Sequence, residues 1–181
     1  MVNSQNKLPE HLLTAAANIK LLLLDVDGVL TDGKLYYGNS GEELKAFNIQ
    51  DGLGIKLLQE GGIQVGIITG RVSALLQRRA DELGINPVIQ GREDKLTAVE
   101  ELLSSSTLTL NEIAFVGDDL PDLAVIKRVG LGITVANASS TLTAQAVMRT
   151  NKSGGDGAVR EVAEFLLRAQ GKLDRLLERY H

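Results

Sequence analysis

The chain reads KLLLLDVDGVLTDG at residues 20–33. The apolar run in this stretch is short and ends at two carboxylates, Asp25 and Asp27, followed by Gly28. A short apolar run that is closed by a turn residue is typical of a strand buried on both faces of a parallel sheet. We therefore expect a strand over residues 20–26 whose carboxyl end carries two acidic side chains.

Apolar runs of similar length recur along the chain and alternate with segments of helical spacing. The expected further strands cover residues 63–69, 88–90, 113–116, 131–135 and 148–150. The expected helices cover residues 9–17, 52–60, 72–83, 93–103, 121–129, 139–147 and 158–180, the last one broken at Gly171. This alternation predicts an α/β fold, Rossmann-like, with a mostly parallel sheet and helices on both faces. Because there is no internal repeat and no linker, we expect residues 1–181 to form one domain.

Two segments depart from this alternation. Residues 34–37 and 43–47 flank the turn-forming tetrapeptide 38–41, which predicts a β-hairpin over about 34–47 that projects from the α/β body. Residues 151–157 are rich in glycine, and we expect them to form a flexible segment.

The composition excludes several kinds of site. The 181 residues include no cysteine, which rules out disulfides, thiolate catalysis and cysteine-ligated metal centres. The two histidines, His11 and His181, lie near the ends of the chain, so neither a Ser-His-Asp triad nor a histidine metal site is expected. The net charge of -4 argues against a nucleic-acid partner. No apolar run approaches the roughly 20 residues that span a bilayer. Since no signal peptide is recognisable either, we expect a cytoplasmic protein without a membrane partner.

Polar side chains gather where the expected strands end. Asp25 and Asp27 follow the first strand, and on an extended backbone residues two apart point to the same side. Later strand ends, and the helix after the short strand 88–90, contribute Thr69, Gly70, Arg71, Lys95, Asp118, Asp119 and Asp122. In open α/β sheets, ligands bind beyond the carboxyl ends of the strands. A single aspartate there more often caps a helix or forms a turn, but the whole set predicts a binding site.

Crowded carboxylates need a compensating cation. Two like charges at about 4 Å repel by roughly 4 kcal/mol at an effective dielectric of 20. A divalent cation removes that cost, and ligands that are all oxygen favour Mg2+ or a similar hard ion. Lys95 would supply a second, fixed positive charge. A metal ion and a few local cations can also bind one phosphate group inside an acidic protein.

The motifs that carry these residues resemble those of the haloacid dehalogenase superfamily of phosphatases. They are Asp25-Val26-Asp27-Gly28-Val29-Leu30-Thr31, Ile68-Thr69-Gly70, Lys95 and Gly117-Asp118-Asp119-Leu120-Pro121-Asp122. The resemblance implies that Asp25 attacks phosphorus and forms an aspartyl-phosphate. It implies that Asp27 protonates the leaving alkoxide and then activates water, and that Thr69 and Lys95 hold phosphate oxygens. A carboxylate nucleophile divides one difficult displacement into two easier steps.

The same resemblance implies a metal site. Mg2+ would be bound by Asp25, by Asp118 and by the backbone carbonyl of Asp27. Asp122 would support this metal site without binding the ion directly, or would reach the ion through a water molecule.

Additional motifs resemble the members of this superfamily that lack a cap domain and act on sugar-acid phosphates. These motifs cover residues 27–33, 47–52, 69–71 and 154–161, together with the hairpin. The stretches between the motifs are also too short for a cap domain. The resemblance implies hydrolysis of 3-deoxy-D-manno-octulosonate 8-phosphate in lipopolysaccharide synthesis. The alternatives are a nine-carbon sialic-type sugar-acid phosphate as substrate, or a non-catalytic module on the same fold.

The resemblance further implies an assembly. The members of this branch are homotetramers in which the hairpins form a central barrel and neighbouring subunits help to close each site. Residues 154–157 resemble a mobile tail that folds over an adjacent site.

The substrate contacts are expected from residues around the same strand ends. They include Asp27, Thr69, Gly70 and Lys95. Arg71 would bind the sugar-acid carboxylate or the phosphate, or else cap carbonyls or form a surface ion pair, and the sequence weighs these equally. Asn48 is a further candidate for the pocket. Asp32 and Asp51 fit turn or cap roles better.

Overall fold

Six parallel strands form the centre of the protein, whose computed structural model describes residues 9–39 and 43–180. The strands are β1 (Leu21–Leu24), β4 (Gln64–Ile68), β5 (Val88–Ile89), β6 (Ile113–Gly117), β7 (Leu131–Thr134) and β8 (Met148–Arg149). Their order across the sheet is β5-β4-β1-β6-β7-β8, so β1 lies in the interior of the sheet. Leu24 of β1 pairs with Ile67 on one side and with Val116 on the other. The sheet confirms the predicted α/β fold.

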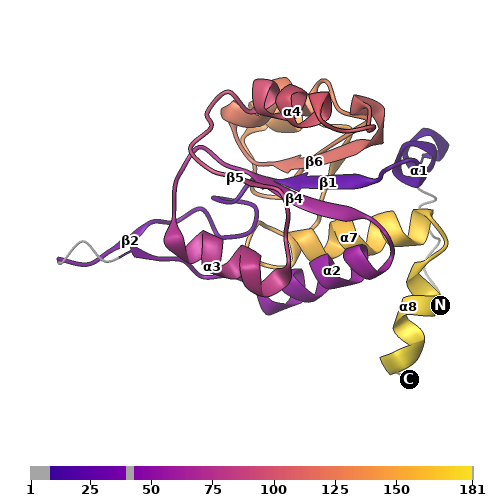
Figure 1. Ribbon diagram of the computed structural model, residues 1–181, viewed down its shortest axis with the longest axis horizontal. Helices are drawn as coiled ribbons and strands as arrows, with labels where there is room; N and C mark the ends of the chain where they lie inside the picture. Colours follow the sequence, from indigo (N-terminus) through magenta and orange to yellow (C-terminus); the bar gives the residue numbers. More distant parts are fainter. Residues whose placement is uncertain (1–8, 40–42, 181) are drawn as a thin grey trace.

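Alternate residues of β1 face opposite layers of helices (Figure 1). Leu22 and Leu24 pack into a core with α1 (Glu10–Ala17), α2 (Ile49–Glu60), α3 (Ala74–Leu83) and α7 (Ala158–Ala169). Leu21 and Leu23 pack on the other face, with α4 (Lys95–Ser104), α5 (Leu123–Ile126) and α6 (Ser140–Thr143). All four leucines are buried, and each buried leucine stabilises the fold by about 1.5–3 kcal/mol. A strand enclosed in this way requires an apolar residue at every position.

Helices α2 and α7 lie side by side beneath the sheet (Figure 1). Gly54 permits their close approach, because an added Cβ would lie 3.0 Å from the Cα of Arg160 and 3.2 Å from the Cβ of Ala163. Asp51, in the first turn of α2, accepts a hydrogen bond from the backbone N–H of Arg160 at 2.8 Å. This carboxylate thereby caps the start of α7 from a neighbouring helix.

Several helices begin or end elsewhere than the sequence predicts. Helix α2 begins at Ile49 rather than at residue 52, because the Oδ1 of Asn48 caps it by accepting the N–H of Gln50 at 2.7 Å. Helices α5 and α6 are much shorter than the expected ranges 121–129 and 139–147. A 3-10 turn (Leu120–Asp122) precedes α5, and α6 contains two β-branched threonines, which are poor helix formers.

The break at Gly171, with a φ of 65°, separates α7 from α8 (Leu173–Leu177) as predicted. Two further 3-10 turns cover Leu110–Glu112 and Glu178–Tyr180.

The hairpin projects from the body beyond the carboxyl edge of the sheet (Figure 1). Its strands are β2 (Tyr36–Tyr37) and β3 (Glu43–Leu44), which pair antiparallel with Tyr36 opposite Leu44. These strands are shorter than the predicted segments, and residues 40–42 of the predicted turn lie outside the described residues. No cap domain is inserted between the described elements, and the hairpin is the part of them that projects beyond the carboxyl edge of the sheet.

The glycine-rich segment 151–157, which the sequence predicts to be flexible, makes close backbone contacts within the chain. It connects β8 to α7 and packs against the turn that follows β1 in the same chain. The N–H of Gly155 donates to the carbonyl of Val29 at 3.0 Å, and the N–H of Gly154 donates to the Oδ1 of Asn137 at 2.9 Å. A Cβ on Gly154 would overlap the carbonyl oxygen of Gly28. Glycine is required at position 154 for this close backbone contact.

Candidate active site

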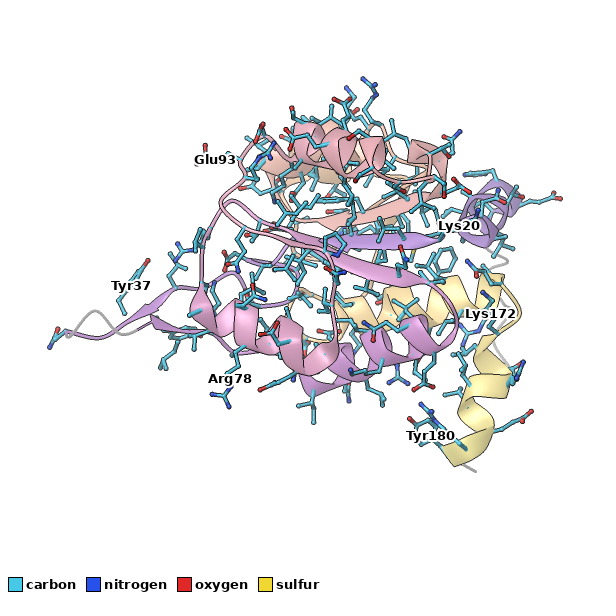
Figure 2. The ribbon with its side chains drawn as sticks, viewed as in Figure 1. Lys20, Tyr37, Arg78, Glu93, Lys172 and Tyr180 are labelled. Carbon is cyan, nitrogen blue, oxygen red and sulfur yellow. The ribbon has the colours of Figure 1, made fainter. Side chains whose placement is uncertain are left out.

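A cavity of about 720 Å³ opens at the carboxyl ends of β1, β4 and β6. It lies where the chain changes direction across the sheet, since the elements that follow β1 are laid down first on its β4 side and then on its β6 side. Tyr37 and Glu93 lie at this end of the molecule, whereas Lys20 and Lys172 lie at the other (Figure 2). The lining includes Asp25, Asp27, Gly33, Thr69, Gly70, Arg71, Glu93, Lys95, Asp118, Asp119, Pro121 and Asp122.

A tight turn after β1 carries the first two carboxylates into the cavity. The N–H of Asp25 still donates to the carbonyl of Val116 at 3.0 Å, which continues the pairing with β6. The N–H groups of Val29, Leu30 and Thr31 then all donate to the carbonyl of Val26, at 3.0 to 3.2 Å. This turn closes the strand.

Lys95 is buried between two carboxylates. It is the first residue of α4, its side chain is 3% exposed, and its Nζ lies 2.8 Å from Asp25 and 2.6 Å from Asp122. Burial is the largest single influence on the pKa of Lys95 and lowers it, but the two carboxylates together outweigh it and raise that pKa above its usual value. Lys95 is therefore positively charged at neutral pH.

Asp122 is fully buried and has both oxygens occupied. Its Oδ1 accepts from Lys95, while its Oδ2 accepts the backbone N–H groups of Asp118 at 3.0 Å and Asp119 at 3.3 Å. These bonds shape the loop after β6 and aim the Asp118 carboxyl at Asp25. Asp122 thus orients the other groups.

The carboxyls of Asp25 and Asp118 are crowded and poorly solvated. Burial, and then the charge of Asp122, raises the pKa of Asp25 to about 6, against the opposing pull of Lys95. Burial, and then the charges of Asp25 and Asp122, raises the pKa of Asp118 to about 7. One lysine does not compensate three carboxylates at this spacing.

These residues fit a hard divalent cation. Asp25, Asp118 and Asp122 each offer an oxygen, and the three oxygens lie within 4.8 Å of one another. Because both oxygens of Asp122 are already bonded, Asp25 and Asp118 are the carboxylates best able to ligate Mg2+. Gly28, with a φ of 97°, leaves room for them, since a Cβ there would overlap the Asp118 carboxylate.

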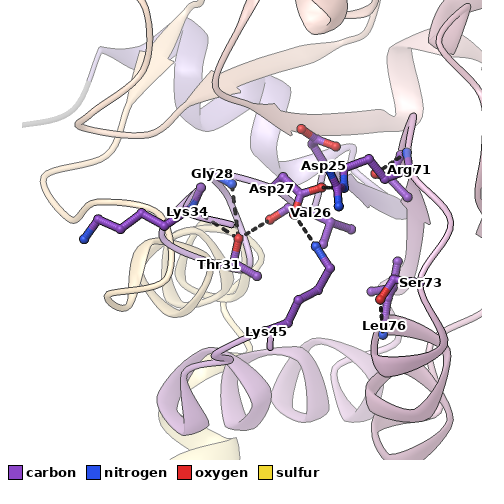
Figure 3. Close-up of polar contacts among 12 residues, drawn as sticks. Asp25, Val26, Asp27, Gly28, Thr31, Lys34, Lys45, Arg71, Ser73 and Leu76 are labelled. Atoms are coloured by element: carbon purple, nitrogen blue, oxygen red, sulfur yellow. Dashed lines mark hydrogen bonds and ion pairs between the residues drawn. The ribbon is translucent and has the colours of Figure 1, made fainter. Parts of the chain in front are cut away.

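Asp27 stands apart from this cluster and has two cationic partners (Figure 3). Its Oδ1 contacts the Nζ of Lys45, and its Oδ2 lies 3.5 Å from the Nε of Arg71. Lys45 follows β3 directly, and its side chain is 3% exposed. The sequence does not single out Lys45, because nothing in the pattern of a short hairpin shows that this lysine turns inward.

The end of β4 supplies a polar rim. Thr69 is buried, and its Oγ1 accepts the N–H of Arg71 at 3.4 Å. Arg71 also reaches the hydroxyl of Tyr37 on the hairpin, at 3.5 Å. Glu93 lines the cavity near Gly70 as well, although the sequence gives no reason to select it.

Asn48 is not among the residues that line the cavity, and its contact with substrate stays a prediction. Its Oδ1 caps α2, and its Nδ2 donates to the carbonyl of Gly155 at 3.3 Å. Asp32 has a turn role, since it accepts from the N–H of Lys34 and the hydroxyl of Tyr36. Asp51, as described above, caps α7.

Comparison with known proteins gives consistent matches. The model of the haloacid dehalogenase-like hydrolase family matches residues 88–162. The chain is 51% identical over 164 residues to 3-deoxy-D-manno-octulosonate 8-phosphate phosphatase KdsC of Salmonella typhi, which covers 91% of this chain and 87% of the relative.

Two crystal structures resemble the whole fold. One is 3-deoxy-D-manno-octulosonate 8-phosphate phosphatase of Moraxella catarrhalis, in complex with magnesium, phosphate and KDO. It is 46% identical, with a TM-score of 0.92, and the match covers 94% of this chain and 98% of that one. The other is a probable yrbi family phosphatase of Pseudomonas syringae, 48% identical, with a TM-score of 0.93 and a coverage of 95% and 98%.

The described part of the chain contains no helix with the length and apolar character needed to cross a membrane.

The identity of 51% extends over 91% of the chain and is high enough to show its family. The chain belongs to the 3-deoxy-D-manno-octulosonate 8-phosphate phosphatase family of haloacid dehalogenase-like hydrolases.

Proposed function

We propose that this protein is a magnesium-dependent phosphatase that hydrolyses 3-deoxy-D-manno-octulosonate 8-phosphate to the free sugar acid and phosphate. The observation that carries the proposal is the cluster of Asp25, Asp118, Asp122 and Lys95 in the lining of the cavity. The cluster places a candidate nucleophile, Asp25, beside the carboxylates suited to a metal ion. The chain that contains it is 51% identical to a phosphatase of this substrate.

Asp25 is the nucleophile in this proposal. Its carboxyl lies on the cavity floor, and its Oδ1 is held by Lys95, which leaves the other oxygen to attack phosphorus. The new bond joins that oxygen to phosphorus, and the bond from phosphorus to the sugar oxygen breaks. Water then hydrolyses the aspartyl-phosphate and restores the carboxylate.

Asp27 is the acid and base of the two steps. It lines the cavity beside Asp25 but is not hydrogen-bonded within the Lys95 cluster. The electron pair of the broken bond stays on the sugar oxygen, which takes a proton from Asp27. Asp27 takes a proton back from the attacking water in the second step.

The remaining residues bind and orient the substrate. Thr69, Gly70 and Lys95 line the phosphate end of the cavity, and Arg71 at its rim is suited to a carboxylate or a phosphate. Mg2+, when bound by Asp25, Asp118 and the backbone carbonyl of Asp27, would offset negative charge on the phosphoryl group. Asp122 keeps Lys95 and the Asp118 loop in place.

A substrate panel tests this proposal. Phosphate release is measured with the eight-carbon 8-phosphate, a nine-carbon sialic-type 9-phosphate and simple sugar phosphates, each with Mg2+ and with a chelator. We expect the highest kcat/KM for the eight-carbon substrate, by about tenfold or more, and no turnover without the metal. A higher value for the nine-carbon substrate contradicts the substrate assignment. Turnover that persists in Asp25→Asn contradicts the mechanism, and no turnover at all indicates a non-catalytic module.

We also propose that the protein is a cytoplasmic homotetramer. The hairpin and the adjoining helix ends expose large apolar side chains that a monomer would leave in water, namely Leu35, Tyr36, Tyr37, Leu44, Ile49 and Val72. Burial of these side chains between copies would also wall the open side of the cavity next to Arg71. Sedimentation velocity measures the mass of the assembly, and a monomer at micromolar concentration contradicts this part of the proposal.

A further inference from the structure

The side chain of Lys45 is as little exposed as that of Lys95, but the proposed reaction gives Lys45 no role. Both side chains are 3% exposed. A lysine is rarely buried unless a specific partner holds its charge. Lys45 contacts the Oδ1 of Asp27, the carboxyl on which both proton transfers depend.

The two cations around Asp27 arrive from different parts of the chain. Lys45 comes from the end of the hairpin, immediately before α2, and Arg71 comes from the loop after β4. Figure 3 shows the extended Lys45 side chain rising from the α2 side to reach Asp27. Lys45 contacts Oδ1 directly and the Nε of Arg71 lies 3.5 Å from Oδ2, so the two cations approach different oxygens of the carboxyl.

Lys45 is the firmer of these two supports. The Arg71 side chain is 39% exposed and lies 3.5 Å from Asp27, whereas Lys45 is enclosed and in direct contact. Asp27 itself is 22% exposed and sits in a turn, so its side chain would have several rotamers open to it without a support. Its proton must reach the leaving oxygen at hydrogen-bonding distance, which leaves little tolerance in position.

We infer that Lys45 is a positioning residue that holds the carboxyl of Asp27 in line with the leaving oxygen of the substrate. This inference rests on the proposed function, in which Asp25 gains a bond to phosphorus while the sugar oxygen leaves with the proton of Asp27. Lys45 acts through Asp27 and does not touch the substrate, since it is not among the residues that line the cavity.

The test compares two leaving groups in a single turnover. The oxygen of the sugar-acid 8-phosphate must be protonated as it leaves, whereas p-nitrophenolate leaves p-nitrophenyl phosphate without a proton. In Lys45→Met, which keeps the length of the side chain and removes its charge, we expect the first-turnover rate with the sugar phosphate to fall roughly 10²-fold. The first-turnover release of p-nitrophenolate should fall less than about threefold, because that step needs no general acid.

Two comparisons separate positioning from a general loss of structure. Lys34→Met removes another lysine of the hairpin, one that is 72% exposed and pairs with Asp32, and should change neither rate. Lys45→Met added to Asp27→Asn should cause no further loss with the sugar phosphate, because the two residues act as one unit. Lys45→Arg, which keeps the cation, should lose less than Lys45→Met.

Equal losses with both substrates, or additive losses in the double variant, would overturn the inference. Full activity of Lys45→Met with the sugar phosphate would do the same. The wild-type enzyme is measured first, so failure of the proposed function appears there as absent turnover of the sugar phosphate. Failure of this inference appears only in the ratio between the two substrates.

Discussion

The three clustered carboxylates, of which Asp25 and Asp122 are buried and Asp118 is partly buried, have different roles because each has different neighbours. Asp122 is saturated by Lys95 and two backbone N–H groups, so it orients the cluster. Asp25 and Asp118 have fewer donors and face the cavity, which leaves their oxygens for a metal ion and for phosphorus. The number of hydrogen bonds that each aspartate accepts therefore decides whether it has a structural or a catalytic role.

Removal of the Lys95 charge should destabilise the metal-free protein strongly. Lys95→Met leaves three acidic groups facing one another without a cation, and loss of one member of a buried ion pair costs roughly 3–5 kcal/mol in the free energy of unfolding. Urea denaturation in the presence of a chelator measures this value, and Mg2+ should restore part of it. Lys20→Met, which removes a lysine that is 63% exposed and paired with Glu112, should cost less than about 1 kcal/mol.

The affinity for Mg2+ should rise with pH. The pKa values of about 6 for Asp25 and about 7 for Asp118 mean that the metal-free protein holds protons on these groups in mildly acidic solution. Metal binding must displace these protons, so affinity should increase with pH and level off only well above the pKa of Asp118, about 7. Titration calorimetry in buffers of different ionisation enthalpy at pH 6 should show proton release, which Asp118→Asn reduces. An affinity that does not vary with pH contradicts this assignment.

The same two groups contribute to the pH dependence of metal-free stability. Their folded pKa values lie above the ordinary 3.8, so the folded state holds more protons than the unfolded state between pH about 4 and about 7. The contribution of these groups to stability is therefore lost as pH rises through that window. Thermal unfolding should show that Mg2+ raises the Tm more at pH 8 than at pH 5.5.

At the scale of elements, the segments that were predicted well are those whose pattern depends on local sequence. The run of leucines in β1 is apolar at every position because both faces are covered, and that can be recognised without a structure. Once such apolar runs are recognised as strands, the ends of the strands are known, and these ends carry Asp25, Thr69 and Asp118. Helix boundaries were predicted less well where a side chain bonds to backbone groups of its own loop, as before α5, where Asp122 accepts the N–H groups of Asp118 and Asp119.

Contacts between distant segments could not be predicted. Asn48 looks like a pocket residue from sequence, but it caps α2 and holds Gly155, far along the chain. Asp51 caps a helix that begins more than 100 residues later. Lys45 was missed for the same reason, since only the folded hairpin places it against Asp27.

The contact between the glycine-rich segment and the turn after β1 should be intolerant of a single added methyl group. In Gly154→Ala the new Cβ meets the carbonyl of Gly28, so the turn that carries Asp27 must shift. We expect kcat to fall by up to about 10²-fold, because small displacements of catalytic groups cost rate steeply.

Gly62→Ala is the matched comparison. Gly62 has a φ of 79°, but nothing lies within 4 Å of an added Cβ, and it is remote from the cavity. The strained backbone should lower stability by roughly 1–2 kcal/mol while kcat stays unchanged. Steady-state kinetics together with thermal unfolding separates the two effects, and equal kcat values for the two variants contradict the contact argument.

At the scale of the whole molecule, the arrangement of layers was predictable and the surroundings of the cavity were not. Alternation of strands and helices fixes a parallel sheet and places the site at its carboxyl edge. In the absence of a cap domain, no local sequence pattern predicts which part of the protein covers the carboxyl edge of the sheet. In the structure the hairpin stands beside the cavity, with Tyr37 in contact with Arg71.

A charge placed on the hairpin should break the proposed tetramer. Leu44 on β3 is 65% exposed, and Leu44→Glu would put a carboxylate into an apolar contact between copies. We expect smaller particles in sedimentation velocity and a higher KM, because the cavity loses its neighbouring wall. Leu13→Glu changes an exposed leucine of α1, at the other end of the molecule, and should leave the mass unchanged. An assembly that tolerates Leu44→Glu is built on a different surface.

The position of the tyrosines makes the hairpin visible by ultraviolet fluorescence. The chain has no tryptophan and three tyrosines, two of them adjacent in β2 and the third, Tyr180, near the carboxyl terminus. All three are substantially exposed, so intrinsic emission reports on the hairpin and the last turn rather than on the core. Docking of copies, or arrival of a substrate beside Tyr37, can therefore be followed without a label, whereas melting of the interior is best followed by circular dichroism.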